Sequence, residues 1–224
     1  MYALHWAVLH GFRLCCALTL EPSRGWDSLL FHYPYTGLVE LQAQALRLRL
    51  VRLRAGRDEE AALVNVFREA RLRGCEAVVS GALLSDCQRL RFASAAEEVG
   101  LRIFTPLWRI DQEEYMRSLV RDDFKVMVVS VQAYGLPSWI VGRVLDKDLV
   151  EDIITRAKRY GFNPAFEGGE AETLVLDAPL FREELRVEGQ VVRLGPDHYF
   201  YEIRRAWLVP KTFTGKDSQE PAES

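Results

Sequence analysis

Residues 81–91 (GALLSDCQRLR) combine a glycine, a helix-capping pair and two arginines. Gly81 follows a short apolar run, and Ser85 with Gln88 has the spacing of a capping box at a helix N-terminus. Backbone N–H groups at such a terminus suit an anion such as phosphate, and Arg89 and Arg91 could clamp a phosphate or a carboxylate in bidentate fashion. A capped surface helix with solvated arginines explains the same residues without a ligand, so spacing alone leaves both interpretations open.

Residues 167–173 (EGGEAET) place three carboxylates beside two glycines. The glycines permit positive φ or a close backbone approach. The carboxylates repel one another unless a magnesium ion, an ammonium ion or an arginine compensates them. Glu170 and Glu172 share one face if the stretch is extended. A solvated acidic turn leading into the apolar run 174–176 is an equally simple interpretation.

Two further segments carry weaker signals. Residues 26–35 crowd aromatic side chains around His32, which suits ligand contact or proton transfer, although a lone histidine among aromatics is more often packed and hydrogen-bonded. Residues 214–218 (TGKDS) are similar to a phosphate loop, but no apolar helix follows them, so we interpret this match as a coincidence.

The elements that must position these residues alternate between helical and strand patterns. Apolar stripes at helical spacing predict helices that end at a glycine or begin at a capping residue, and short apolar runs between them predict strands. The helices are expected near residues 1–10, 63–73, 85–99, 111–120 and 150–160, and the strands near 77–79, 102–104 and 126–129.

This alternation is typical of βαβ units, so we expect an α/β fold with a parallel sheet and helices on both faces. Ligands of such sheets bind beyond the carboxyl ends of the strands, where residues 81–91 fall. We therefore expect the 81–91 turn and the 167–173 turn to face a common cleft there. After about residue 163 the pattern changes: 185–194 reads as two short strands joined around Glu188-Gly189, 199–209 as a further strand, and 212–224 as a disordered tail.

Composition excludes several classes of protein. The 224 residues carry 29 basic and 32 acidic side chains, a net charge of −3, so no global field favours nucleic acid or a membrane surface. The spacing of the four cysteines matches neither a zinc site nor a disulfide framework, and we expect reduced, packed thiols. No apolar run reaches the ~18 residues of a membrane span, and no signal peptide opens the sequence. We expect a cytoplasmic protein in which no set of side chains serves as metal ligands.

Taken together, these segments resemble one family, the diphthine–ammonia ligases. Five blocks carry the resemblance in order: residues 28–32 (SLLFH), 41–46 (LQAQAL), 81–91, 106–115 with Pro-Leu-Trp and Glu-Tyr, and the double-glycine acidic segment 167–173. The resemblance runs from about residue 1 to 209. The family is similar to the N-type ATP pyrophosphatases, which implies a HUP-like fold of the adenine nucleotide α-hydrolase class. It implies a nucleotide-binding α/β domain over residues 1–132, N-terminally incomplete, and a smaller α+β substrate domain over 133–211.

The resemblance also implies an activity. Enzymes of this family use ATP and Mg²⁺ to activate the carboxylate of diphthine on elongation factor 2. The acyl-adenylate is attacked by ammonia, which gives diphthamide, AMP and pyrophosphate. The expected partners are therefore diphthine-bearing elongation factor 2 and ammonium, with a homodimer as a further expectation and no direct contact with nucleic acid or membrane.

Site residues carry over from the matching blocks. The nucleotide is expected to be bordered by Gly81, Ser85, Gln88, Arg91 and His32. The catalytic carboxylates are expected to be Glu170, Glu172 and Glu167, with Glu170 the first choice for holding ammonium. The substrate wall is expected to include Gly168, Gly169 and Thr173.

The sequence departs from the family at two places. The family has Ser-Gly-Gly-Lys-Asp-Ser just before the helix that matches residues 1–10, and this sequence begins where that loop ends. In the 81–91 block a tyrosine of the family is Cys87 here. We expect an upstream start or a truncated gene, and weak or absent ATP pyrophosphatase activity of the chain as given. The alternatives are a non-catalytic relative that binds a nucleotide or elongation factor 2, and a generic α/β fold without a nucleotide site.

Overall fold

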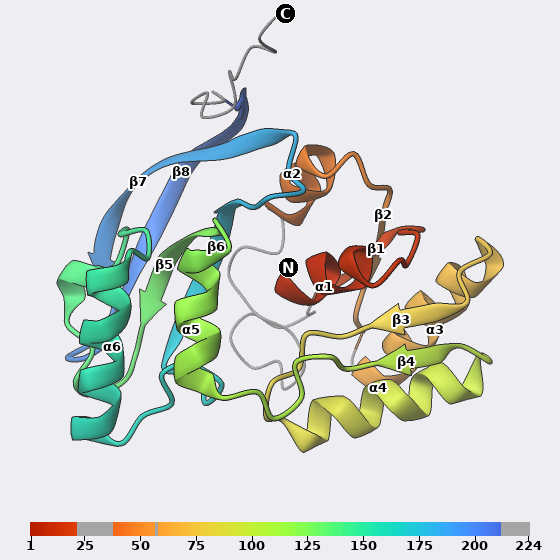
Figure 1. Cartoon of the computed structure of the whole chain (residues 1–224), viewed down its shortest axis with the longest axis horizontal. Helices are drawn as coiled ribbons and strands as arrows, with labels where there is room; N and C mark the ends of the chain where they lie inside the picture. Colours follow the sequence, from red (N-terminus) through yellow and green to blue (C-terminus); the bar gives the residue numbers. More distant parts are fainter. Residues whose placement is uncertain (22–37, 57, 212–224) are drawn as a thin grey trace, which may run out of the picture.

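The computed structural model describes residues 1–21, 38–56 and 58–211 of the chain. Two small parallel sheets form the first half, and one antiparallel sheet forms the second (Figure 1). Helix α1 (Tyr2–Leu9) lies between the two halves in this view. As its sequence predicts, α1 has no side-chain cap at its start, and Gly11 after it adopts φ 80°.

The first half contains four short strands. β1 (Ala17–Glu21) pairs in parallel with β2 (Leu50–Arg54), and β3 (Ala77–Val79) pairs in parallel with β4 (Arg102–Phe104). The expected parallel pairing is confirmed, but the strands divide into two sheets, and among the described residues no ladder joins β1 to β3. The HUP-like arrangement therefore stays a prediction.

Capped helices connect these strands. α3 (Glu59–Leu72) begins after Asp58, and α4 (Asp86–Glu98) begins after Ser85, and each capping side chain accepts a backbone N–H from its own first turn. The shorter α2 (Val39–Ala45) precedes β2. The inner faces of α3 and α4 pack with β1, β2 and β3 into one apolar cluster. This packing fixes the position of β3 and therefore of the turn at residue 81 that follows it.

The second half is an antiparallel sheet with strand order β6-β5-β8-β7. Its strands are β5 (Lys125–Val131), β6 (Ala171–Asp177), β7 (Glu183–Arg193) and β8 (Tyr199–Pro210). The expectation that 126–129 is a strand covered on both faces is confirmed. Its assignment to the parallel sheet is wrong, because β5 pairs antiparallel with β6 and β8. The domain boundary after residue 132 stays a prediction, although β5 joins the sheet of the second half.

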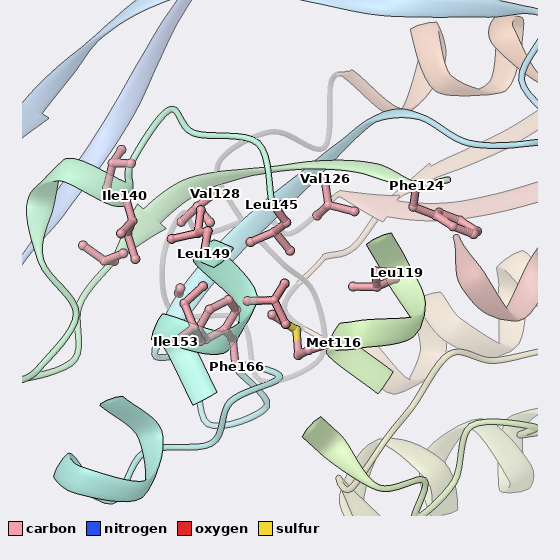
Figure 2. Close-up of a cluster of buried hydrophobic side chains, with 14 of the residues drawn as sticks. Met116, Leu119, Phe124, Val126, Val128, Ile140, Leu145, Leu149, Ile153 and Phe166 are labelled. Carbon is pink, nitrogen blue, oxygen red and sulfur yellow. The ribbon is translucent and has the colours of Figure 1, made fainter. Parts of the chain in front are cut away.

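The core beside this sheet positions the acidic segment. Helices α5 (Gln112–Arg121) and α6 (Lys147–Tyr160) cover one face of β5, and Figure 2 shows Val126 and Val128 among their apolar side chains. Phe166 belongs to the same cluster and is 7% exposed. The opposite face of the sheet is covered by residues that include Leu38 and Leu41 of the α2 region. Burial on both sides explains why the β5 sequence is continuously apolar.

β7 corrects one expectation about the second half. The sequence suggested two short strands joined around Glu188-Gly189, but the structure has a single strand of 11 residues with a register shift at that place. A Cβ on Gly189 would lie 2.1 Å from the backbone oxygen of Glu202, so the glycine permits a bulge instead of a turn.

Within the described ranges, none of the helices has the length and apolar content needed to cross a membrane.

Candidate functional site

The turn after β3 is held by apolar packing and by backbone hydrogen bonds. Leu83 is buried, and its carbonyl accepts the backbone N–H of Arg109 at 2.8 Å. Arg109 has φ 59°, a conformation that costs a non-glycine residue free energy. The 105–110 loop is thus fixed against the 81–84 turn, and Leu84 is left exposed with its N–H directed across to the second half.

The acidic loop is held by one of its own carboxylates. Glu170 Oε1 accepts the N–H of Asn163 at 2.9 Å, and Oε2 accepts the N–H of Gly168 at 2.8 Å. Gly169 has φ 80°, and its carbonyl accepts from the Gln132 side chain. The double glycine therefore closes a tight loop around Glu170.

Phe166 anchors the acidic loop to the apolar core. It has φ 64° and is buried in the core between α5 and α6 (Figure 2). An unfavourable backbone conformation is maintained only where packing enforces it, and here the buried ring does so. The next residue, Glu167, is thereby directed toward the 81–84 turn.

The two turns meet at a direct hydrogen bond. The backbone N–H of Leu84 donates to Glu167 Oε2 at 3.1 Å, across 83 residues of sequence. Leu83 and Ala165 also pack in one small apolar cluster with Tyr115. These contacts confirm that the 81–91 and 167–173 segments lie side by side, and a common ligand cleft between the two turns stays a prediction.

A cavity of about 1170 Å³ lies beside Gly81 and Tyr115, although neither Leu84 nor Glu167 lines it. Residues Ser80 and Gly81 line it from the end of β3, and Glu172 and Thr173 line it from β6, together with Tyr115 of α5. This volume is ample for a nucleotide-sized ligand. Of the site residues expected from the sequence, the structure thus gathers Gly81, Glu172 and Thr173 around one space.

Tyr115 gives the junction its electrostatic character. Burial raises the pKa of Tyr115 to about 12, and the neighbouring carboxylate of Glu167 contributes in the same direction. Near neutral pH the phenol therefore keeps its proton, so beside Glu167 it can serve only as a neutral polar group and a hydrogen-bond donor.

The arginines of α4 do not converge on the junction. Arg89 stacks 4.9 Å over the Trp108 ring and pairs with Asp86, whereas Arg91 lies 3.3 Å from Glu60 of α3. Arg91 lines a separate hollow of about 550 Å³ between α3 and α4. A clamp made by these two arginines is therefore not present in this arrangement.

The other expected residues divide into two groups. Ser85 acts as the N-cap, with its Oγ accepting the Gln88 N–H at 3.3 Å, so the capping interpretation is confirmed and contact of either residue with a nucleotide stays a prediction. Glu170 does not share a strand face with Glu172, because β6 begins only at Ala171 and the Glu170 carboxylate points back into its loop. His32 lies outside the described residues, as does the 214–218 segment.

Backbone donors stabilise the acidic segment. The side chains of Glu167 and Glu170 accept peptide N–H groups from Leu84, Asn163 and Gly168. Compensation of the three carboxylates by magnesium, ammonium or an arginine stays a prediction. Sequence reasoning missed Asn163 and Phe166, although an apolar residue immediately before an acidic turn is a usable sign of an anchored loop.

Two family models match the chain, one over each of its two structural halves. Residues 1–103 match the family model described as diphthamide synthase N-terminal domain, and residues 111–213 match diphthamide synthase C-terminal domain. The diphthine–ammonia ligase of Schizosaccharomyces pombe is 29% identical over 78% of this chain, that of Homo sapiens 35% over 52%, and that of Mus musculus 27% over 99%. The matched region spans 32% of the yeast protein, 44% of the human protein and 91% of the mouse protein.

Proposed function

Since the chain belongs to the diphthamide synthase family, we propose that it catalyses the ATP-dependent amidation of diphthine on elongation factor 2. The observation that supports this most directly is the hydrogen bond from Leu84 to Glu167. It joins the turn that follows a parallel strand, where nucleotides bind, to a carboxylate loop suited to handling ammonium. The two reacting partners of an amidation, an activated carboxylate and an amine, would meet at this junction.

The proposed reaction has two steps. The diphthine carboxylate oxygen attacks the α-phosphorus of ATP, which releases pyrophosphate and leaves an acyl-adenylate. The ammonia nitrogen then attacks the acyl carbon, the carbon–oxygen bond to AMP breaks, and one proton leaves the new amide nitrogen. A free carboxylate is a poor electrophile, so adenylation supplies the leaving group, and fixed positions of the two reactants supply much of the rate.

The geometry distinguishes the roles of the glutamates. Both oxygens of Glu170 already accept backbone N–H groups, which makes it a positioning residue for the loop. Glu167 lies at the junction, with one oxygen oriented by Leu84 N–H and with the neutral phenol of Tyr115 nearby. We therefore assign to Glu167 the binding of ammonium and the acceptance of its proton, and to Glu172 a place on the cavity wall.

The described residues fit the nucleoside part of ATP better than its phosphates. The cavity is large enough for adenosine and is lined at the end of β3 by Ser80 and Gly81. Among the described residues that line it, the basic side chains are Arg13, Arg73 and Arg102, which flank the starts of the strands rather than their carboxyl ends. Mg²⁺, when bound, would offset the triphosphate charge.

The test is an amidation assay with the full chain. Diphthine-bearing elongation factor 2, ATP, Mg²⁺ and ammonium are incubated with the protein, and AMP release and the amide product are measured. We expect AMP and the amide in equal amounts, but at the low turnover that the sequence predicts for this chain. We further expect Glu167→Gln to lower kcat at least about 100-fold, a typical size for loss of a proton acceptor, with the fold unchanged.

The control is Glu97→Gln, because Glu97 is an exposed carboxylate on α4. Its activity should equal that of the parent. Binding of ATP or of elongation factor 2 without any AMP release would instead support a non-catalytic relative. Full activity in Glu167→Gln would remove this residue from the site.

A further inference from the structure

The three cysteines at the starts of β1 and β3 form a cluster that the proposed reaction does not use. Cys15 and Cys16 directly precede β1, and Cys75 lies two residues before β3. Their sulfurs lie within 4.8 Å of one another. The expectation of reduced, packed thiols is wrong for Cys15 and Cys75, which are joined by a disulfide with Cα atoms 5.9 Å apart. Cys16 Sγ lies 3.6 Å from Cys75 Sγ.

A disulfide alone leaves the third sulfur unexplained. Two sulfurs bound to one tetrahedral zinc ion at bond lengths of about 2.3 Å lie about 3.8 Å apart. The separation of Cys16 from Cys75 is close to this value. After reduction, Cys15 needs only a side-chain rotation to reach a similar distance, because its backbone is already within bridging range of Cys75.

The surroundings of the cluster suit three bound thiolates. Cys75 is buried, Cys16 is half-buried and Cys15 is exposed, so the site would have a dry inner side and an outer side open to water. Three thiolates around a divalent cation carry one net negative charge. Burial of Cys16 disfavours its charged form, and Arg73 and Arg49 act electrostatically in the opposite direction.

From this convergence of three sulfurs we propose that the reduced chain binds one soft divalent cation, Zn²⁺ in the first instance, through Cys15, Cys16 and Cys75, with water as the fourth ligand. A thiol or phosphine reductant first supplies two electrons and two protons to the disulfide. The three thiols then bind the cation and release three protons. The site lies at the opposite ends of the strands from the junction of Leu84 with Glu167, so we assign it a role in stability and none in the amidation.

The role follows from the two sheets that the cluster joins. β1 and β3 belong to separate parallel sheets, and the described residues contain no backbone ladder between them. A cation held by residues that precede both strands would fix the two sheets relative to each other at the edge of the large cavity. Binding to the folded state alone raises stability by mass action.

The experiment uses Co²⁺ and Zn²⁺ as probes of the full chain, reduced with a phosphine and freed of metal. Co²⁺ titration should saturate at one equivalent with thiolate charge-transfer absorbance, and Zn²⁺ should displace it and raise the thermal midpoint. Alkylation followed by mass spectrometry should label the exposed Cys15 and Cys87 without metal, but only Cys87 with Zn²⁺ bound.

The variants separate this site from adventitious binding. Cys15→Ser and Cys16→Ser should weaken binding more than the roughly 10–100-fold expected for loss of a group outside the ligand set. Cys87→Ser is the matched control, since Cys87 is exposed on α4, and it should bind as the parent does. Circular dichroism checks the fold of each variant, and exposed Cys15 is the one whose replacement disturbs packing least. Absence of thiolate absorbance in the reduced parent, or parental affinity in Cys16→Ser, would overturn the proposal.

Discussion

At the scale of single residues, Glu170 organises the candidate site. Its two oxygens bind the N–H groups of Asn163 and Gly168, which lie on either side of the buried Phe166. Charge-assisted hydrogen bonds of this kind are stronger than those between neutral groups. The carboxylate thus fixes the loop that carries Glu167, and its effect on catalysis would pass through that loop.

We expect Glu170→Ala to fold but to lose most amidation activity, because the loop would no longer hold Glu167 against Leu84. Amide hydrogen exchange should quicken at Asn163 and Gly168 while the β5 amides keep their protection. Glu170→Gln retains an acceptor oxygen and should recover part of the activity. Unchanged exchange together with lost activity would indicate that Glu170 acts on the reactants directly.

Tyr115 predicts a change of stability at alkaline pH. Burial raises its folded-state pKa to about 12, above the ordinary value of 10.0. The unfolded chain therefore releases this proton first as pH rises, so the free energy of unfolding should fall between pH 10 and 12. In Tyr115→Phe the fall should be smaller. Denaturant titrations across this range measure it, with the exposed Tyr134→Phe as a control that keeps the full slope.

At the scale of elements, helix starts were the most predictable features. Ser85 and Asp111 cap α4 and α5 as their spacing indicates, because a cap depends on residues only three apart. β1 and β2 were not predicted. Their short sequences, ALTLE and LVRLR, become strands through parallel pairing and through the cover of α3, and neither is a local property.

Strand direction was likewise beyond the sequence pattern. The apolar run of β5 correctly indicated burial on both faces, but antiparallel sheets can also be covered twice, here by α5 and α6 on one face and the α2 region on the other. Gly189 was misinterpreted for a similar reason. A glycine marks a bulge or a turn according to what lies opposite, and that is a backbone carbonyl of β8.

The cap of α4 gives a prediction at this scale. Ser85→Ala removes the acceptor for Gln88 N–H and should cost about 1 kcal/mol of unfolding free energy. It should also loosen the adjoining turn and slow amidation. Ser94→Ala, an exposed change inside the same helix, is the control and should leave stability equal or slightly higher, as alanine favours helix. Urea unfolding of both variants gives the comparison.

At the scale of the whole molecule, α1 joins the two halves. Its His5 is buried, and Nε2 accepts the backbone N–H of Leu180 at 3.0 Å, beyond the end of β6. On the same helix, Tyr2 donates to Asp122 at the end of α5. The two hydrogen bonds join residues that are 175 and 120 positions apart in the sequence, so local patterns do not predict them.

His5 predicts a loss of stability in mild acid. Burial lowers the pKa of His5 below its ordinary value of 6.5, and the Leu180 bond requires the unprotonated nitrogen. The stability that this residue provides is complete above about pH 6.5 and should be lost as pH falls toward the folded-state pKa. His5→Gln keeps an acceptor without titrating and should flatten this acid dependence. The exposed His10→Gln should not, and equal slopes in both variants would contradict the assignment.

The contact between Leu84 and Glu167 has a consequence for how the protein is made. It joins residues 83 positions apart, and the segments that carry them come from different cores, β3 from the cluster of the first half and Phe166 from that of the second. Contacts of such large sequence separation form late, because chain entropy opposes them until the neighbouring structure exists. During refolding, the circular dichroism signal of the helices should therefore return before amidation activity. The delay between the two would measure how fast one half docks on the other.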